Sequence, residues 1–306
     1  STRRSTLDYL AVGLPIGKFG VGFGMIPYSS VGYKIESIAK DINQNSSRFD
    51  GKGGVNKVFL GIGYKINPKW SIGADAHYSF GKIETNSLEF VSGIPVGTSE
   101  SNNVDLKGVN FNFGLMYQTK IKDKLNFYSS FNYAVESKLK STTTRAISIV
   151  EYDANYNMAI VDAADPLVSN VNLKFPTKIT FGAGIGQARK WLLGAQISTR
   201  AAANLNNSYN SGSNVSYEGF QKFSLGGYFI PNYNSFTSYA KRIIYRAGLR
   251  YEKTGLVLNS KSITDIGFTL GLGFPVTGSF SNVNIGFELG KKGTTSANLV
   301  QENYAN

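Results

Sequence analysis

One group of residues in the chain has the types needed for hydrolytic chemistry. Asp75 and His77 lie two residues apart, and Ser71 and Ser79 continue the same spacing. In a β-strand, side chains at this spacing share a face and lie within about 7 Å of each other. A Ser-His-Asp catalytic triad also needs an oriented nucleophile and an oxyanion site, and neither is recognisable in this sequence. We therefore expect no enzymatic activity and interpret Asp75 and His77 as hydrated residues that could contact a ligand.

Three arginines form a second group with binding potential. Arg200, Arg246 and Arg250 each lie on the polar face of an expected strand. Their guanidinium groups could hold a ligand carboxylate through paired N–H donors. The alternative is that they pair with acidic side chains of the same protein, because charges inside a narrow fold need partners. The candidate acids are Glu136, Glu252 and Glu288.

Composition excludes several other kinds of site. The chain has no cysteine and one histidine, so a Cys/His zinc site and a cysteine nucleophile are excluded. Residues 182–186, Gly-Ala-Gly-Ile-Gly, are similar to a phosphate-binding loop, but another strand follows where a helix would be required. No cofactor or metal is expected. The net charge of +12 is spread over turns and strands, which argues against a nucleic-acid partner.

The elements that must position these residues are strands with one apolar and one polar face. Between Trp70 and Gly81, even-numbered residues are apolar and odd-numbered residues are small, polar or charged. This alternation recurs near residues 108–117, 125–136, 191–200, 243–252 and 266–273. No apolar run approaches the roughly 18 residues of a membrane-spanning helix. The pattern therefore predicts an all-β protein.

The connections between these strands alternate in length. Short links fall near residues 17–18, 67–69, 120–124, 187–190 and 276–281, and long polar links are expected at residues 36–54, 83–105, 137–174, 201–219 and 255–264. Short turns at one end and long loops at the other are typical of an outer-membrane β-barrel. Aromatic residues at both ends of strands, such as Trp70 and Phe80, span about 25 Å, the height of an apolar band. A soluble β-sandwich is the alternative, but it does not require aromatics at two heights.

The strand count predicts a single barrel domain over residues 1–306. Twelve strands are expected, and a thirteenth begins near Asn303. Bacterial barrels have an even number of strands with both ends in the periplasm. We therefore expect a transmembrane antiparallel β-barrel of fourteen strands, whose first strand and most of whose last strand lie outside this sequence.

Three segments carry a resemblance to a known family: residues 21–33, VGFGMIPYSSVGY; residues 175–182, FPTKITFG; and residues 245–252, YRAGLRYE. They look like the FadL/OmpP1/TodX family, in particular its Bacteroidota members. The resemblance implies a fourteen-stranded barrel with an N-terminal luminal hatch. It also implies uptake of hydrophobic compounds such as fatty acids, which leave sideways into the membrane beside a kink in the third strand.

On this count the third strand begins at Phe19, and Pro27 interrupts it. Proline lacks an N–H and therefore breaks a strand ladder. The resemblance makes the following residues the candidate lateral opening: Pro27, Tyr28, Ser29, Ser30 and Gly32. The alternative is that Pro27 only ends a strand near the membrane surface.

Two functions of different classes follow. The first is passive transport of small hydrophobic, fatty-acid-like molecules across the bacterial outer membrane, with outer-membrane lipids or lipopolysaccharide as further partners. The second is a non-transporting barrel that serves as a structural subunit of an outer-membrane assembly or secretion complex. A lipid hydrolase ranks third. Apolar segments at residues 146–150 and 159–161 could cover the mouth, extend strands above the membrane or contact a partner.

Overall fold

The fold is almost entirely antiparallel β-sheet. The computed structural model describes residues 9–39, 44–122, 124–152, 158–203, 214–276 and 281–306. None of the helices in these ranges is long and apolar enough to cross a membrane. The described elements are β1 (Leu10–Ile16), β2 (Phe19–Ser37), β3 (Ser46–Lys65), β4 (Trp70–Phe90), β5 (Val96–Lys122), β6 (Leu125–Ala134), β7 (Ser137–Tyr152), β8 (Met158–Ala163), β9 (Leu167–Phe175), β10 (Lys178–Gln187), β11 (Trp191–Arg200), β12 (Val215–Tyr217), β13 (Phe220–Phe229), η1 (Ala240–Arg242), β14 (Ile244–Leu258), β15 (Lys261–Pro275), β16 (Asn282–Gly293), η2 (Ser296–Asn298) and β17 (Gln301–Ala305).

All of these strands belong to one sheet, and several share a position in it. One part of β5 pairs with β6 and another part pairs with β7, so β6 and β7 are two halves of one strand position. The same holds for β9 and β10, which pair with β7 and β6, and for β12 and β13, which both pair with β14. Counting each pair once and leaving out β8, which pairs with β7 alone, gives thirteen strand positions in the described residues. The predicted all-β, antiparallel fold is confirmed.

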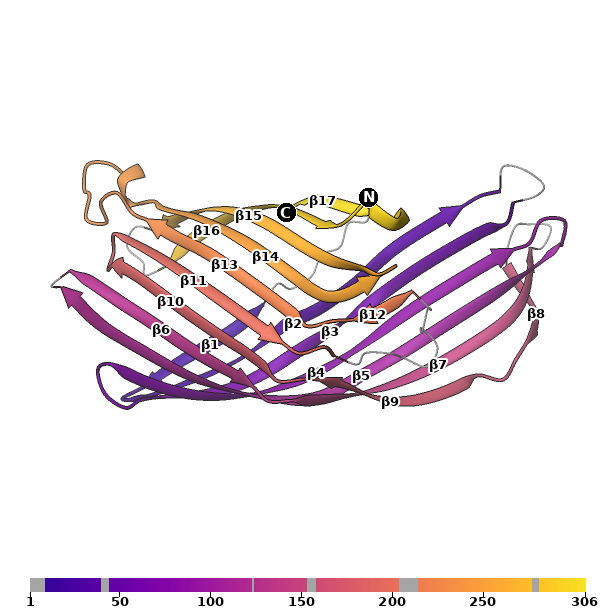
Figure 1. The fold of residues 1–306 in the computed structure, drawn as a ribbon, viewed down its shortest axis with the longest axis horizontal. Helices are drawn as coiled ribbons and strands as arrows, with labels where there is room; N and C mark the ends of the chain where they lie inside the picture. The colour runs from indigo at the N-terminus through magenta and orange to yellow at the C-terminus, as the bar shows by residue number, and fades with distance from the viewer. Residues whose placement is uncertain (1–8, 40–43, 123, 153–157, 204–213, 277–280) are drawn as a thin grey trace.

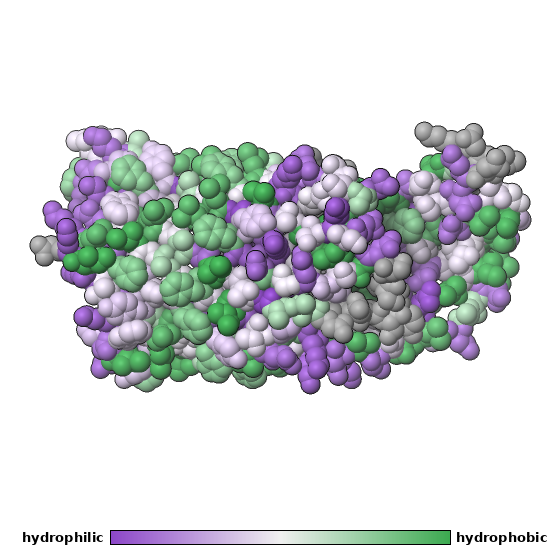
Figure 2. Space-filling model, viewed as in Figure 1, coloured by the Kyte–Doolittle hydropathy of each residue, from purple (hydrophilic) through white to green (hydrophobic). Residues whose placement is uncertain are grey.

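The sheet curls around on itself (Figure 1), and most of its large apolar side chains are exposed. Ile72 and Tyr78 of β4 are exposed on one face, whereas Ser79 on the opposite face is only 3% exposed. Few apolar side chains in the described residues are buried, because the apolar residues face the surroundings and do not form a central core. Figure 2 shows apolar residues gathered over the strands around β10–β14 in the left part of the view. A lipid-facing exterior explains this distribution.

One side of the wall is much taller than the other. β5 has 27 residues and β4 has 21, whereas β11 and β13 have 10 each. The upper parts of β2–β5, together with β7–β9, form an extension on the right of Figure 1. Most of the links expected at residues 36–54, 83–105 and 137–174 are therefore strands, and their expectation as loops was wrong.

The extension forms because its polar residues pair across strands. Lys52 lies 2.9 Å from Glu84 on the neighbouring strand. On the other face, Arg145 donates hydrogen bonds of 2.8 and 2.9 Å to the two carboxylate oxygens of Glu100. Alternating charges of opposite sign stabilise a ladder that has no apolar face to bury. A polar composition alone therefore misidentifies these strands as loops.

The edges of the described sheet are β1 and β17. β1 pairs with β2, joined by a two-residue turn in which Gly17 has a φ of 61°, and β17 pairs with β16. Glycine suits this turn because it accepts a positive φ without strain. The fourteenth strand and the single-domain extent over residues 1–306 stay predictions.

Candidate functional site

The lumen contains a row of glycines that crosses four strands. Gly184 faces Gly194, which faces Gly226, which in turn faces Gly248. These residues border a cavity of about 830 Å³ on the inner side of the wall. Its other lining residues include Tyr128, Ser130, Gln196, Ser224 and Thr269. Because glycine has no side chain, the row leaves this part of the lumen open.

A second glycine row lies on the N-terminal part of the wall. Gly20, Gly63, Gly73 and Gly114 face one another across β2–β5. A smaller cavity of about 480 Å³ lies against this row and is also bordered by Asp75 and His77. The lumen is therefore hollow beside two separate parts of its wall.

Asp75 and His77 form a hydrogen-bonded group with an asparagine from the next strand. Asn112 Nδ2 donates to Asp75 Oδ1 over 2.6 Å and lies 3.2 Å from His77 Nε2. His77 Nε2 also contacts Asp75 directly. Within the described residues no serine hydroxyl is hydrogen-bonded to His77, so the arrangement lacks the nucleophile contact of a hydrolase. Asp75 and His77 are together, as their spacing predicts, and Asn112 is the partner that sequence reasoning missed.

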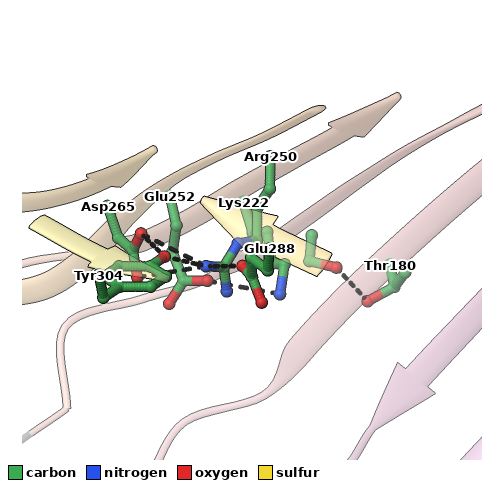
Figure 3. Close-up of polar contacts among 8 residues, drawn as sticks. Thr180, Lys222, Arg250, Glu252, Asp265, Glu288 and Tyr304 are labelled. Atoms are coloured by element: carbon green, nitrogen blue, oxygen red, sulfur yellow. Dashed lines mark hydrogen bonds and ion pairs between the residues drawn. The ribbon is translucent and has the colours of Figure 1, made fainter. Parts of the chain in front are cut away.

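Arg250 lies at the centre of a polar cluster, the Arg250 cluster, formed with Asp265, Glu288 and Tyr304 (Figure 3). Its Nη2 lies 2.7 Å from Glu288, 3.3 Å from Asp265 and 2.6 Å from the Tyr304 hydroxyl. That hydroxyl donates to Asp265 over 2.7 Å. Arg250 is thus paired with acids, as one of the two interpretations expected, and its Nη2 is fully occupied.

Glycines make room for the Arg250 cluster. A Cβ on Gly290 would lie 2.1 Å from the Tyr304 ring, and one on Gly267 would lie 2.9 Å from Glu288 Oε1. These distances are too short for a side chain. The inward glycines of β15 and β16 therefore leave room for the luminal side chains of the cluster.

The other two predicted arginines have different surroundings. Arg246 Nη1 donates to Asn284 over 2.9 Å, and the residue is otherwise exposed. Arg200 places its guanidinium 5.5 Å from the Phe175 ring and 5.4 Å from the Phe220 ring. Its buried Nε has no hydrogen-bond partner among the described residues. Neither arginine pairs with an acid there, so both retain donors for a ligand.

Three lysines that sequence reasoning missed lie near Arg200. Lys178 faces Arg200 across β10 and β11, and Lys222 lies on the inward face of β13, 3.4 Å from Glu252. Lys57 on β3 belongs to a distant part of the wall, yet the charges of Lys178 and Arg200 act on it. The alternation along each strand predicts that each lysine faces the lumen, but it does not predict that the lysines lie near one another.

β2 continues through the candidate opening and changes register there. Pro27 pairs with Asn56 and Ser29 pairs with Val55, so Tyr28 is an extra residue, a β-bulge. The strand runs on to Ser37 and does not end at Pro27. Ser30 and Gly32 also pair with β3.

The outer face of the wall also contains an apolar groove of about 790 Å³. It lies over Gly227 and Ala247, two small residues that face each other on β13 and β14. Larger outward side chains border it, including Leu193, Leu225, Tyr245, Leu249, Leu270 and Leu272. This groove and the luminal cavity lie on opposite faces of the same strands, and Gly226 and Gly248 are among six residues that border both.

Solved structures with a similar fold are channels and transporters. The chain is similar to a Pseudomonas aeruginosa FadL homologue, with a TM-score of 0.60 and 14% identity over 93% of this chain and 68% of that one. It is also similar to the Pseudomonas putida toluene transporter TodX, with a TM-score of 0.58 and 16% identity over 92% of this chain and 76% of that one. The monoaromatic hydrocarbon channel CymD has a TM-score of 0.55 and 14% identity over 93% of this chain and 77% of that one. At these identities the likeness shows the fold, and the expected FadL-type barrel is confirmed at that level.

Sequence comparison identifies the family directly. No curated protein matches the chain. A family model described as BamG matches residues 1–306, the whole length of the sequence given. A match of this extent shows membership, and the chain therefore belongs to the BamG family.

Proposed function

We propose that the protein is an outer-membrane conduit through which small hydrophobic, fatty-acid-like molecules diffuse passively. The observation that carries this proposal is the luminal cavity of about 830 Å³ beside the glycine row of Gly184, Gly194, Gly226 and Gly248. A cavity of this size is in the range that accommodates small-molecule ligands. The solved channels and transporters of similar fold support the same function class.

The lining of the cavity suits an amphiphilic cargo. Met116, Tyr128 and Leu192 provide apolar contact, whereas Gln196 and Thr269 provide hydrogen-bonding groups. Pockets with mostly apolar walls and a few polar groups bind such molecules with loose selectivity. Diffusion through the lumen would need no cofactor and no covalent step.

Four of the five predicted ligand-binding residues fit this proposal. Asp75 and His77 border the smaller cavity, and Arg200 and Arg246 have donors that no described carboxylate occupies. Arg250 borders the cavity of about 830 Å³, but its guanidinium is paired with Asp265 and Glu288. Arg200 and Arg246 lie outside the lining of both luminal cavities, and we propose that their donors contact cargo on its way to or from the larger one.

A lateral exit beside Tyr28 is part of the proposal. The bulge at Tyr28 interrupts the register of β2 against β3. A bulge locally disrupts the ladder and twists the strand. The opening would be formed by Pro27, Tyr28, Ser29, Ser30 and Gly32, and cargo would pass there into the membrane.

The test is uptake of a fluorescent fatty acid into vesicles that contain the purified barrel. Gly194→Leu adds a side chain to the luminal glycine row, and we expect it to reduce uptake at least about tenfold because it fills part of the cavity. Ala247→Leu is the control, because Ala247 is exposed on the outer face, pairs with Gly227 and does not border the luminal cavity, so the same side chain then enters the lipid. Equal uptake by the two variants, or none by the parent protein, would refute the conduit.

A second function is favoured by a different observation. β8 lies in the extension and carries exposed apolar side chains: Met158 is 51% exposed, Ile160 66% and Val161 54%. Apolar residues exposed away from the lipid-facing band are typical of protein contacts. This favours a structural subunit of an outer-membrane complex, the alternative that the sequence left open. Stoichiometric copurification with other subunits, together with unchanged fatty-acid uptake by cells that lack the protein, would support it.

A further inference from the structure

Four basic side chains face the lumen near the long-loop end of the barrel. We name Lys57, Lys178, Arg200 and Lys222 the mouth cluster. Arg200 is the last residue of β11 and Lys178 the first of β10, so both lie where strands leave the spanning wall. They face each other directly in the sheet. The mouth cluster therefore has a definite place at the entrance of the lumen.

The mouth cluster joins two walls of the barrel. Lys57 comes from β3, and β4, β5 and β6 separate that strand from β10 in the order of pairing. The charges of Lys178 and Arg200 nevertheless act on Lys57, and those of Lys222 and Arg200 act on Lys178. Lys178, Arg200 and Lys222 are neighbours on β10, β11 and β13 by strand pairing, and Lys57 is within range of their charges.

The positive charges of the mouth cluster are not balanced by described carboxylates. Lys222 pairs with Glu252 over 3.4 Å, but Lys57, Lys178 and Arg200 form no ion pair with any described residue. The buried Arg200 Nε has no partner there. Partly buried cations that repel one another are costly unless an anion accompanies them. Four cations against one carboxylate leave an excess that suits a group with more than one negative charge.

Aromatic rings hold three of these cations in place. Lys57 Nζ lies 3.5 Å from the centre of the Tyr28 ring, and Lys178 Nζ lies 5.5 Å from that of Phe220. The Arg200 guanidinium lies near both Phe175 and Phe220. Ring faces attract cations but do not accept all of their N–H donors. The cluster is therefore positioned while its donors stay free for an oxyanion.

We propose that the mouth cluster binds a phosphate group, either free or as the head of an amphiphile. Charged rings of Lys and Arg select phosphate in other pores by the same electrostatics. Arg200 supplies planar paired donors and the lysines supply point charges, a combination that suits a tetrahedral dianion. This inference rests on the proposed function in one respect: the bound phosphate group enters the lumen as part of the cargo.

The test is titration of the purified barrel in neutral detergent with inorganic phosphate, followed by phosphorus NMR and by the midpoint of thermal unfolding. We expect Arg200→Gln and Lys178→Gln each to weaken phosphate binding at least about tenfold, the loss of one charged hydrogen bond. Lys107→Gln is the control, because that exposed lysine pairs with outward-facing Phe80 and should not alter binding. Parent-like binding by both luminal variants, or an equal thermal shift with sodium chloride at matched ionic strength, would overturn the site.

A second titration with dodecyl phosphate distinguishes the two sources of the anion. Binding at least tenfold tighter than that of inorganic phosphate, and lost in Arg200→Gln, identifies an amphiphile head. Equal affinities identify free phosphate. Dodecyl phosphate binding that Arg200→Gln leaves unchanged counts against the site. Phosphate binding that depends on Arg200, without fatty-acid uptake by the barrel, would refute the conduit and support the phosphate site. Fatty-acid uptake without such phosphate binding would support the conduit and refute the phosphate site.

Discussion

The mouth cluster and the Arg250 cluster lie in the same lumen but differ in charge balance. Arg250 is surrounded by two carboxylates and a phenol, and the phenol also donates to one of the carboxylates, Asp265. In the mouth cluster, four cations share one carboxylate, Glu252, and aromatic rings take the place of acids. The difference indicates that a luminal charge with internal partners supports the wall, whereas a luminal charge without them is free to bind.

Removal of the central arginine should break the Arg250 cluster. Arg250→Met would leave Asp265 and Glu288 close together without a cation, and we expect it to lower the free energy of unfolding by about 2 kcal/mol, less than for a fully buried pair because the lumen is hydrated. Chemical denaturation followed by tryptophan fluorescence measures this change. Arg246→Met is the control, since Arg246 has Asn284 as its hydrogen-bond partner and is exposed. An equal loss in both variants would show that the cluster has no special stabilising role.

Opposite effects on stability are expected within the mouth cluster. Lys222→Gln should lower the free energy of unfolding by about 1 kcal/mol, because Glu252 loses its partner. Lys178→Gln should raise it by about 0.5 kcal/mol without phosphate, because it relieves repulsion from Lys222 and Arg200. The same denaturation series measures both. A loss of stability in Lys178→Gln would mean that the mouth cluster is balanced like the Arg250 cluster.

The ion pair of Glu100 with Arg145 lies in the extension, outside the lumen, and we expect its loss to have the smallest effect on stability. Hydrogen bonds from Arg145 hold the pKa of Glu100 below its usual range. A carboxylate with a lowered pKa stabilises the fold above its unfolded pKa, and this contribution is lost as the pH falls through the folded pKa. We expect acidification to increase hydrogen exchange around Glu100 and Arg145 by an amount worth less than about 1 kcal/mol. Glu100→Gln should remove this pH dependence, and an unchanged pH profile in that variant would contradict the assignment.

The fold was predictable from the sequence because apolar and polar residues alternate along every strand that has one face in lipid and the other in the lumen. The alternation between Trp70 and Phe80 identified both faces, and its recurrence along the chain located thirteen strands. Loop parity added the fourteenth, which stays a prediction. The extension was missed because its strands carry polar residues on both faces. Lys52 and Glu84, for example, stabilise each other only after their strands have paired.

The site was predictable only in part, because its contacts join residues far apart in the sequence. Asp75 and His77 share one strand and were found together. Tyr304 on β17 reaches Arg250 on β14 across the two intervening strands, and the charge of Arg200 acts on Lys57 from another part of the wall. Neither approach has a local signal, since each depends on how the sheet curls. The alternation along a strand predicts which side chains face the lumen, but it does not predict which other side chains they contact there.

The central claim is that cargo occupies the lumen and not the outer groove over Gly227 and Ala247. Crystals grown with dodecyl phosphate that is brominated at its methyl end test it directly through the anomalous signal of bromine. We predict a bromine peak in the cavity beside Gly194 and Gly226, with the phosphate density at Arg200 and Lys178. A bromine peak confined to the outer groove, with an empty lumen, would contradict the account.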